Sequence, residues 1–364
     1  MAQPAQTWLP FQVAAHEIGG RLVASLDPVE ASLDDFVRAD VRGPYDATSQ
    51  EIGPFATVWR FRGARGDGPP VVLVPPFSGY VAGVASPLIA ALMCYRPVIV
   101  IEWHDARRVP EAAGRFGLEE QIEVVERTLL DAGPGAVVVG LSQSVVATLG
   151  GAALAAAAGA PAAVVALLAG PVDTRGGAHP PSLLLRWQPA ALLEAQFTTA
   201  VPGRFPGAGR PVYPGVLQLL AYAYGCPPMY LEAHLGVVHE LANGGPGVRT
   251  REHRDLHSLL DVPGELFLDT IVSAFHDHDL ANGTLTCDGR RVDLAALGGV
   301  RLLTVEGTAD DLVGPGQTHA AADLVPHAGV RRVTVEGARH HEMFTGARFF
   351  EAVEPHLGAM LDAA

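Results

Sequence analysis

The chain has 364 residues and a formal net charge of −14, from 25 cations, all of them arginine, and 39 acidic residues. Hydrophobic residues make up 49% and charged residues 18%, and mean hydropathy is +0.23, which excludes a disordered chain because disorder requires low hydrophobicity and high charge. The acidic balance also argues against a nucleic-acid-binding protein, since phosphates are neutralised by a basic surface.

The first 65 residues are expected to form an N-terminal extension that ends in a strand, Thr57–Phe61. The N-terminus has neither an early cation nor a sustained apolar core, so it does not resemble a secretory signal. The three cysteines are far apart and form no CxxC pair: Cys94, Cys226 and Cys287. A disulfide framework or a cysteine zinc site is therefore not expected, and a reducing cytoplasm is.

Residues 66–173 alternate short apolar runs with helical patterns. The expected strands are Val71–Val74, Val98–Trp103, Ala136–Val139 and Ala163–Leu168. The expected helices between them are Ala82–Met93, Leu118–Asp131 and Val145–Ala158. This alternation predicts an α/β fold with a mostly parallel central sheet and helices on both faces.

One stretch of this region, residues 132–172, carries no charged side chain over 41 residues. By length alone such a stretch suggests a transmembrane helix. It is interrupted, however, by the turn residues Gly140–Ser144 and by Gly159 and Pro161. A buried parallel strand and a helix enclosed in a core are both nearly all apolar. A strand–turn–helix–strand unit is therefore predicted, and no transmembrane segment.

Residues 174–297 are rich in proline, aromatics and histidine, and the strand pattern resumes only in residues 298–364. Helices are expected at Pro189–Thr198, Gly215–Tyr224, Met229–Asn243 and Gly264–Asp277 in the first segment, and at Gln317–Leu324 and Phe349–Leu361 in the second. The late strands are Arg301–Val305 and Arg331–Val335. An insertion of helices between strands of one sheet predicts a cap over its carboxyl edge, where ligands bind.

Gly140-Leu141-Ser142-Gln143-Ser144 lies where a strand is expected to end and a helix to begin. This context is typical of the nucleophile elbow G-x-S-x-G, here with Ser144 in place of the last glycine. Ser142 is the candidate nucleophile, although a helix N-cap would explain a serine here equally well.

A serine nucleophile needs a base and an orienting acid, which follow it in the order Ser…Asp…His. Asp310 comes directly after one late strand and His340 after the next, so the predicted catalytic set is Ser142, Asp310 and His340. Their neighbours Asp311 and His341 remain alternatives. An oxyanion hole would use the Gln143 amide and the amide of Phe77 or Ser78, since the two preceding prolines have no N–H.

No metal and no cofactor are expected. His253 and His257 have the i, i+4 spacing of a helical ligand pair but lack the glutamate of HExxH. His276–Asp279 could bind a cation, but a solvated polar cluster at a helix end is the simpler interpretation.

Several segments together resemble the intracellular polyhydroxyalkanoate (polyhydroxybutyrate) depolymerases of bacteria. They are Trp103–Arg107, Gly114–Leu118, Gly170–Arg175, Pro206–Arg210, Val212–Gly215, Thr304–Gly307 with Asp310 and Asp311, and Gly316–Thr318. The resemblance extends from about Val71 to the C-terminus and implies an α/β-hydrolase fold. It places the family's acid and base on Asp310 and His340. That family typically carries cysteine as the nucleophile, where this chain has Ser142.

The resemblance implies a cytoplasmic serine hydrolase that cleaves the esters of poly(3-hydroxybutyrate) to 3-hydroxyalkanoate monomers or oligomers through an acyl-enzyme, at the granule surface. A general carboxylesterase or lipase is the nearest alternative, followed by an acyltransferase similar to polymer synthases. Cap residues that could contact the polymer, or simply pack in the cap, are Trp187, Tyr222, Tyr224 and Tyr230. A homo-oligomer is compatible with the sequence.

Overall fold

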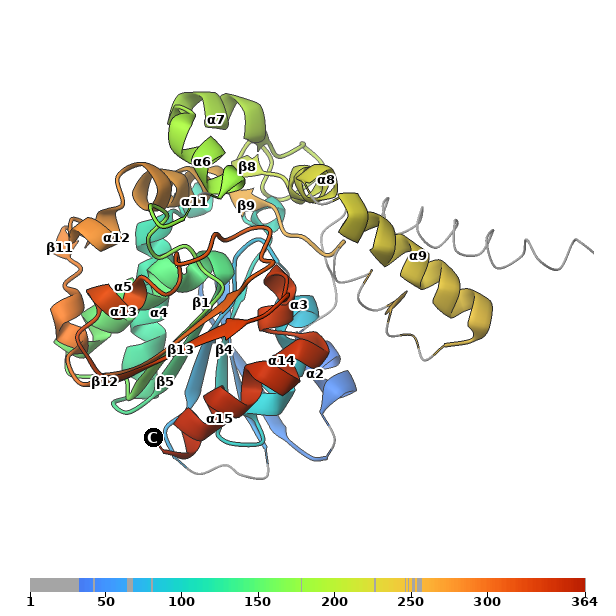
Figure 1. Cartoon of the computed structure of the whole chain (residues 1–364). Helices are drawn as coiled ribbons and strands as arrows, with labels where there is room; N and C mark the ends of the chain where they lie inside the picture. Colours follow the sequence, from blue (N-terminus) through green and yellow to red (C-terminus); the bar gives the residue numbers. More distant parts are fainter. Residues whose placement is uncertain are drawn as a thin grey trace, which may run out of the picture.

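The computed structural model describes residues 33–41, 43–63, 68–79, 81–177, 179–225, 227–245, 247, 249–250, 253 and 257–363. At its centre is an eight-stranded sheet with the order β1-β2-β4-β3-β5-β6-β12-β13 (Figure 1). The strands are β1 (Asp46–Gly53), β2 (Ala56–Arg62), β3 (Val71–Val74), β4 (Val98–Trp103), β5 (Val137–Leu141), β6 (Val164–Leu168), β12 (Val300–Gly307) and β13 (His327–Val335).

β2 is antiparallel to both β1 and β4, and all other pairs in the sheet are parallel. The described strands of the expected N-terminal extension are thus continuous with the main sheet. Every residue of β3, β5 and β6 is buried, which explains their unbroken apolar, mostly β-branched sequences. The apolar composition of these strands therefore predicts both that they lie in the middle of the sheet and that they are buried.

Helices cover both faces of the sheet. Figure 1 shows α4 and α5 on one face, and α2, α3, α14 and α15 on the other. Their bounds are α2 (Leu33–Asp40), α3 (Val81–Leu92), α4 (Leu118–Ala132), α5 (Val145–Ala157), α14 (Gly346–Ala352) and α15 (Glu354–Asp362). The uncharged stretch becomes β5, α5 and β6 in the middle of the fold. Among the described residues, no helix is both long and apolar enough to cross a bilayer.

Two of the expected late helices differ from the structure. The helix expected over residues 349–361 is divided at Val353, because Pro355 lies in the first turn of α15 and cannot continue a helix from before it. The helix expected over residues 317–324 is reduced to α13 (Ala321–Leu324). The turns before α13 are instead held by the Glu306 carboxylate, which accepts the backbone N–H groups of Gly316, Thr318 and His319.

A long insertion separates β6 from β12, although these two strands pair directly. Its elements are α6 (Pro180–Trp187), α7 (Ala190–Phe197), β7 (Thr199–Ala200), β8 (Pro211–Tyr213), α8 (Gly215–Gly225), α9 (Pro227–Asn243), β9 (Val262–Pro263), α11 (Gly264–Ile271), the π-helical turn η5 (Val272–His276), α12 (Asp279–Asn282), β10 (Thr286–Cys287), β11 (Arg290–Arg291) and η6 (Leu294–Leu297). α6, α7, α8 and the small sheet β7-β8-β9 lie beyond the carboxyl ends of the central strands (Figure 1).

Buried arginines join the insertion to the loop that follows β4. The Arg107 guanidinium bonds Asp105 of the same loop at 2.8 Å and contacts Asp261 of the insertion at 3.3 Å. Arg210 of the insertion is 1% exposed and donates to the carbonyl oxygens of Val109, Pro110 and Gly114. A buried charge is tolerated only when it is paired or fully hydrogen-bonded, so these contacts fix the insertion on the carboxyl edge of the sheet.

Candidate active site

Ser142 directly follows β5 and has a positive φ of 50°. Non-glycine residues rarely adopt this left-handed conformation, and it is found where a side chain must project from a tight turn. The turn requires small neighbours. A Cβ on Gly170 would lie 2.5 Å from Cγ2 of Val145 and nearer still to the Ser142 carbonyl oxygen. The glycine at the end of β6 therefore leaves the space that the elbow occupies.

Ser144 replaces the last glycine of the elbow pattern, and its hydroxyl has a structural explanation. The side chain is fully buried. Its Oγ lies 2.7 Å from the carbonyl oxygen of Val74 and 2.8 Å from that of Leu141, and it accepts the Leu141 N–H at 3.2 Å. The hydroxyl therefore links the end of β5 to the end of β3, the strand that leads to Phe77.

Ser142, His340 and Asp310 form one hydrogen-bonded chain. Ser142 Oγ lies 2.8 Å from Nε2 of His340, and Nδ1 of His340 lies 3.0 Å from both carboxylate oxygens of Asp310. An ionised carboxylate can only accept, so Nδ1 carries the proton and Nε2 accepts from the serine hydroxyl. The side chains of His340 and Asp310 are each 3% exposed. The arrangement is that of a nucleophile, a base and an orienting acid.

The carboxylate of Asp310 is kept ionised. Burial by itself raises its pKa, but the neighbouring His340, as a charge and as a hydrogen-bond donor, and the N–H groups of Val313 and Leu312 outweigh burial and hold the pKa below its usual value. Both N–H groups donate to Oδ1 at 2.9 Å. The Asp310 carboxylate therefore accepts hydrogen bonds from these two backbone groups and also from the His340 imidazole.

The acid that accepts the Nδ1–H of His340 is Asp310, with Nδ1 3.0 Å from both of its carboxylate oxygens. His341 packs edge-on against His340, with the ring centroids 5.4 Å apart. Desolvation, together with the neighbouring His340, lowers the pKa of His341 to about 4. His341 is therefore a neutral ring beside the hydrogen-bonded chain at neutral pH.

The segment after β3 reaches the elbow through the Gln143 side chain. The Phe77 N–H donates to Oε1 of Gln143 at 3.2 Å, and Nε2 of Gln143 donates to Gln121 at 3.1 Å and to Thr270 of α11 at 3.3 Å. The Ser78 carbonyl oxygen accepts the N–H of Leu260, from the insertion, at 3.0 Å. Gln143 therefore holds the candidate oxyanion segment against the elbow, with the insertion packed behind it.

The cap residues that were expected to contact the polymer differ in their surroundings. Trp187 is 79% exposed at the end of α6. Tyr230 is half-buried on α9, with its ring centroid 4.4 Å from that of His234. α8 includes Tyr222 and Tyr224, but the side chains of these two tyrosines lie outside the described part of the chain.

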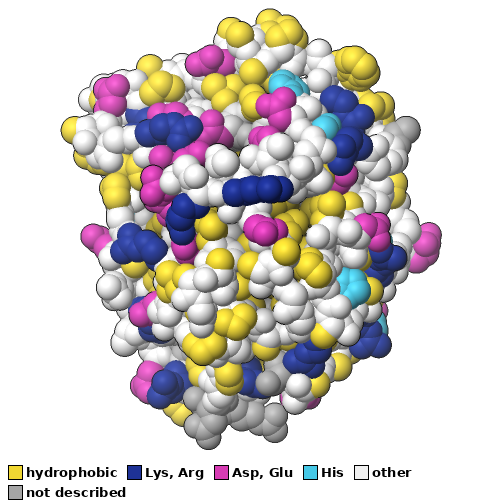
Figure 2. Space-filling model, turned by 90° about the vertical axis from the view of Figure 1, so that its left-hand side faces the viewer, with side chains coloured by type: hydrophobic (Ala, Val, Ile, Leu, Met, Phe, Trp, Pro, Cys, Tyr) yellow, Lys and Arg dark blue, Asp and Glu magenta, His cyan; other side chains and the backbone are white. Residues whose placement is uncertain are grey.

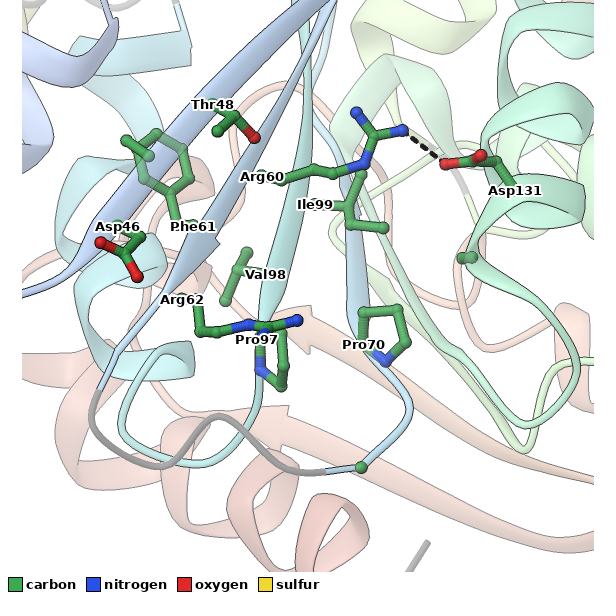
Figure 3. A pocket seen from close by; sticks show the side chains of 13 residues that line it. Asp46, Thr48, Arg60, Phe61, Arg62, Pro70, Pro97, Val98, Ile99 and Asp131 are labelled. Atoms are coloured by element: carbon green, nitrogen blue, oxygen red, sulfur yellow. Dashed lines mark hydrogen bonds and ion pairs between the residues drawn. The ribbon is translucent and has the colours of Figure 1, made fainter.

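A surface pocket lies at the opposite edge of the sheet. Its lining includes Pro70 and Pro97, which directly precede β3 and β4, and the ion pair between Arg60 and Asp131 (Figure 3). Ligands of parallel sheets bind beyond the carboxyl ends of the strands, and Ser142 lies at that end. The pocket is therefore separate from the candidate active site.

Glu306 and Thr318 support the site and were not predicted as functional from the sequence. Thr318 Oγ1 donates to the Gly170 carbonyl oxygen at 2.8 Å and accepts the Gly170 N–H at 2.9 Å. Glu306 in turn accepts the Thr318 N–H at 2.8 Å. The loop after β12 is thereby joined to the glycine that makes room for the elbow. The only sequence signal for these residues was their place in segments shared with the resembling family.

The mostly parallel sheet, the strained serine after its central strand β5, and a histidine and an aspartate after the last two strands define an α/β-hydrolase. Solved structures with this fold include a hydrolase from Pseudomonas aeruginosa PA01, with 18% identity, a TM-score of 0.51, and coverage of 87% of this chain and 98% of that one. A monoacylglycerol lipase from Paleococcus ferrophilus has 15% identity, a TM-score of 0.50, and coverage of 84% and 99%. At these identities the likeness shows the fold alone.

A family model described as PHB de-polymerase C-terminus matches residues 169–364. The match covers more than half of the chain, which belongs to this family. It includes Asp310 and His340, whereas Ser142 lies before it. No curated protein matches the chain. Family and fold together support an ester hydrolase.

Proposed function

We propose that the protein is a serine hydrolase that cleaves the ester bonds of poly(3-hydroxybutyrate) or a related polyhydroxyalkanoate. The observation that carries the proposal is the hydrogen-bonded chain from Ser142 through His340 to Asp310, in a chain that belongs to the PHB de-polymerase C-terminus family.

In the first half of the reaction, Ser142 Oγ attacks the carbonyl carbon of the ester while its proton passes to Nε2 of His340. The imidazolium is stabilised by the ionised Asp310 carboxylate. The tetrahedral intermediate then collapses. Its bond to the alcohol oxygen breaks, and His340 gives the proton to that oxygen, which leaves as the hydroxyl end of the shortened polymer.

In the second half, water attacks the acyl-enzyme. His340 takes a proton from the water and returns it to Ser142 Oγ as the acyl–oxygen bond breaks. A 3-hydroxyalkanoate acid, monomer or oligomer, is released and the serine is restored. Both steps follow the general scheme of acyl transfer through a covalent intermediate.

The oxyanion is proposed to be stabilised by the backbone N–H of Gln143 and by an amide of the Phe77–Ser78 segment. Such preorganised donors contribute about 3–4 kcal/mol each to acyl-transfer catalysis. The Phe77 N–H already donates to an amide oxygen, that of the Gln143 side chain, which is chemically similar to an ester carbonyl oxygen. The carbonyl oxygen of a bound ester would replace Oε1 of Gln143 as the acceptor of the Phe77 N–H, or would accept the Ser78 N–H instead.

The insertion, residues 174–297, is proposed to act as a cap that contacts the polymer surface. Among the described residues, its exposed large apolar side chains are Leu184 (58%), Trp187 (79%), Leu192 (44%), Leu220 (58%), Leu231 (59%), Leu235 (56%) and Leu241 (36%). Large apolar side chains gathered on one part of a surface are typical of interaction sites. In Figure 2 hydrophobic side chains lie at the top of the face and also across its middle, with charged side chains of both signs between them. The proposed cellular site is a polymer granule in the cytoplasm.

A fluorophosphonate probe and a soluble p-nitrophenyl acyl ester test the mechanism. We expect covalent labelling at Ser142 and loss of at least about 10³-fold in kcat for Ser142→Ala, with the same thermal unfolding temperature as the wild type. Full ester hydrolysis by folded Ser142→Ala would show that another group is the nucleophile. Cys287 is an informative control, because burial raises the pKa of its thiol to about 12 and Cys287→Ala should leave labelling unchanged.

A further inference from the structure

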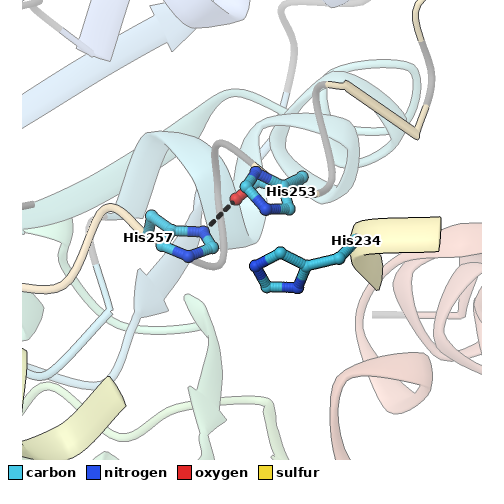
Figure 4. A group of neighbouring side chains, drawn as sticks. All are labelled: His234, His253 and His257. Carbon is cyan, nitrogen blue, oxygen red and sulfur yellow. Dashed lines mark hydrogen bonds between the residues drawn. The ribbon is translucent and has the colours of Figure 1, made fainter. Parts of the chain in front are cut away.

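Three histidines from separate parts of the insertion meet beside helix α9. His234 lies on α9, while His253 and His257 lie in the segment that leads to β9 (Figure 4). One potential ligand atom from each side chain lies within 4.8 Å of the other two. The His253 ring is stacked on that of His257 with 4.2 Å between centroids, and His234 meets His253 edge-on at 4.6 Å. His253 and His257 are buried and His234 is half-buried.

The hydrogen bonds of two of these rings fix their tautomers. Nδ1 of His234 lies 2.7 Å from the Tyr230 carbonyl oxygen. Nδ1 of His257 lies 2.7 Å from the His253 carbonyl oxygen (Figure 4). A carbonyl oxygen can only accept, so Nδ1 is the donor in both rings and Nε2 carries the lone pair. A histidine that binds a metal almost always donates its other N–H to a carbonyl or a carboxylate in this way.

The dimensions of the cluster are close to those of a metal site. Zinc binds histidine nitrogens at about 2.0–2.1 Å in tetrahedral geometry, which places the nitrogens about 3.3 Å apart. The ligand atoms lie within 4.8 Å of one another and would therefore approach by at most roughly 1.5 Å on binding, a distance within reach of side-chain rotations. Three neutral imidazoles and no thiolate or carboxylate are a ligand set that suits Zn²⁺ and the neighbouring first-row divalent ions.

We propose that His234, His253 and His257 bind a divalent transition-metal ion of the Zn²⁺ class, with a water molecule as the fourth ligand. Sequence reasoning considered only the pair His253 and His257 and set it aside for lack of a glutamate. The third ligand comes from a helix 19 residues earlier in the chain, where no spacing motif could indicate it.

A metal ion here would cross-link two parts of the insertion, because the three histidines join α9 to the segment behind the candidate oxyanion loop. Just after His257, Leu259 forms a β-bridge with Gly79 and the Leu260 N–H donates to Ser78. At its other side α9 approaches the turn before His340, with Glu232 3.6 Å from Arg339. A metal ion at the three histidines would thus hold α9 across the carboxyl edge of the sheet without contacting Ser142.

The direct test is metal binding by the full chain, purified without a histidine tag and stripped with a chelator. Calorimetric titration with ZnCl₂ should give one ion per chain, and CoCl₂ should give the intense visible absorption of a tetrahedral cobalt site. Each of His234→Ala, His253→Ala and His257→Ala should weaken binding by about 100-fold or more. The matched control is His239→Ala, an exposed histidine on the same helix α9, which should bind as the wild type does.

Two further measurements keep the proposal testable if a variant folds poorly. Zinc should raise the unfolding temperature of the stripped wild-type chain, and Ser142→Ala should bind zinc as the wild type does, whatever the reaction proves to be. The proposal is overturned if the wild-type chain binds no zinc or cobalt at one equivalent, or if folded His253→Ala and His257→Ala bind them unchanged; the cluster would then be a packing arrangement of imidazole rings.

Discussion

Gly170→Ala tests the packing of the turn at Ser142 against the end of β6. The new methyl carbon would lie 2.5 Å from one γ-carbon of Val145 and nearer still to the other and to the Ser142 carbonyl oxygen. Non-bonded carbons normally approach to about 3.5–4.0 Å, so the overlap is at least about 1 Å on three atoms. One of the three belongs to the backbone of Ser142, which no side-chain rotation can move away.

Overpacking a buried site costs typically 1–3 kcal/mol, and we expect the upper end here because Val145 is fully buried. A loss of about 3 kcal/mol corresponds to a decrease in Tm of roughly 4 °C for a chain of this size. Displacing the Ser142 backbone should also lower kcat on soluble esters by about 100-fold, since a shift of 1 Å is enough for such a loss.

The assay combines thermal unfolding with p-nitrophenyl ester kinetics, and Val145→Ala gives an internal test. In a Val145→Ala background two of the three overlaps are removed, so Gly170→Ala should cost at least about 1 kcal/mol less there. Its kcat should stay low, because the contact with Ser142 remains. The control is Gly329→Ala in β13, where no atom lies within 4 Å of the new carbon. Wild-type Tm and kcat in Gly170→Ala would refute the reasoning.

Three other predictions follow from the site and its surroundings. Asp310→Asn should lower kcat by on the order of 10²–10⁴ with little change in KM, because the amide can donate to Nδ1 of His340 and favour the wrong tautomer; a KM effect alone would contradict this role. His341→Gln should keep most of the activity that His340→Gln loses. The pKa of His341 falls from 6.5 to about 4 on folding, so its contribution to stability is present above pH 6.5 and is lost as pH falls toward 4. In His341→Gln, the free energy of unfolding from denaturant titrations should fall by up to about 3 kcal/mol less over this pH range than in the wild type. The same pH dependence in both proteins would argue against this role of His341. Exchanging Leu184 and Trp187 for serine should weaken sedimentation with amorphous granules by at least about tenfold while p-nitrophenyl ester turnover is unchanged; equal loss of both would point to a folding defect instead.

Much of the central sheet could be predicted because its strands are buried on both faces. β3 and β4 begin and end where predicted: β3 is buried throughout, and β4 is buried at every position except Glu102. β1 (Asp46–Gly53) was not predicted, because its residues are polar and only one strand pairs with it. β13 begins four residues earlier than expected for a related reason, as its first half is mostly exposed. Propensity and periodicity give little signal where a strand is solvated.

The candidate site could be predicted in its order along the chain but not in its contacts. A serine after a buried strand, followed by an aspartate and a histidine after later strands, predicted that Ser142, Asp310 and His340 meet. The choice against Asp311 and His341 needed the hydrogen bonds to His340. The role of Ser144 could not be predicted, because its bond to Val74 joins strands far apart in sequence.

Incubation with native amorphous poly(3-hydroxybutyrate) granules tests the central claim most directly. Soluble products would be separated and identified by mass spectrometry for the wild type and for Ser142→Ala. We expect 3-hydroxybutyrate or its short oligomers from the wild type and none from the variant. Hydrolysis of p-nitrophenyl esters without any soluble product from granules would contradict the assignment of the polymer as substrate, and products from the folded variant would contradict the nucleophile.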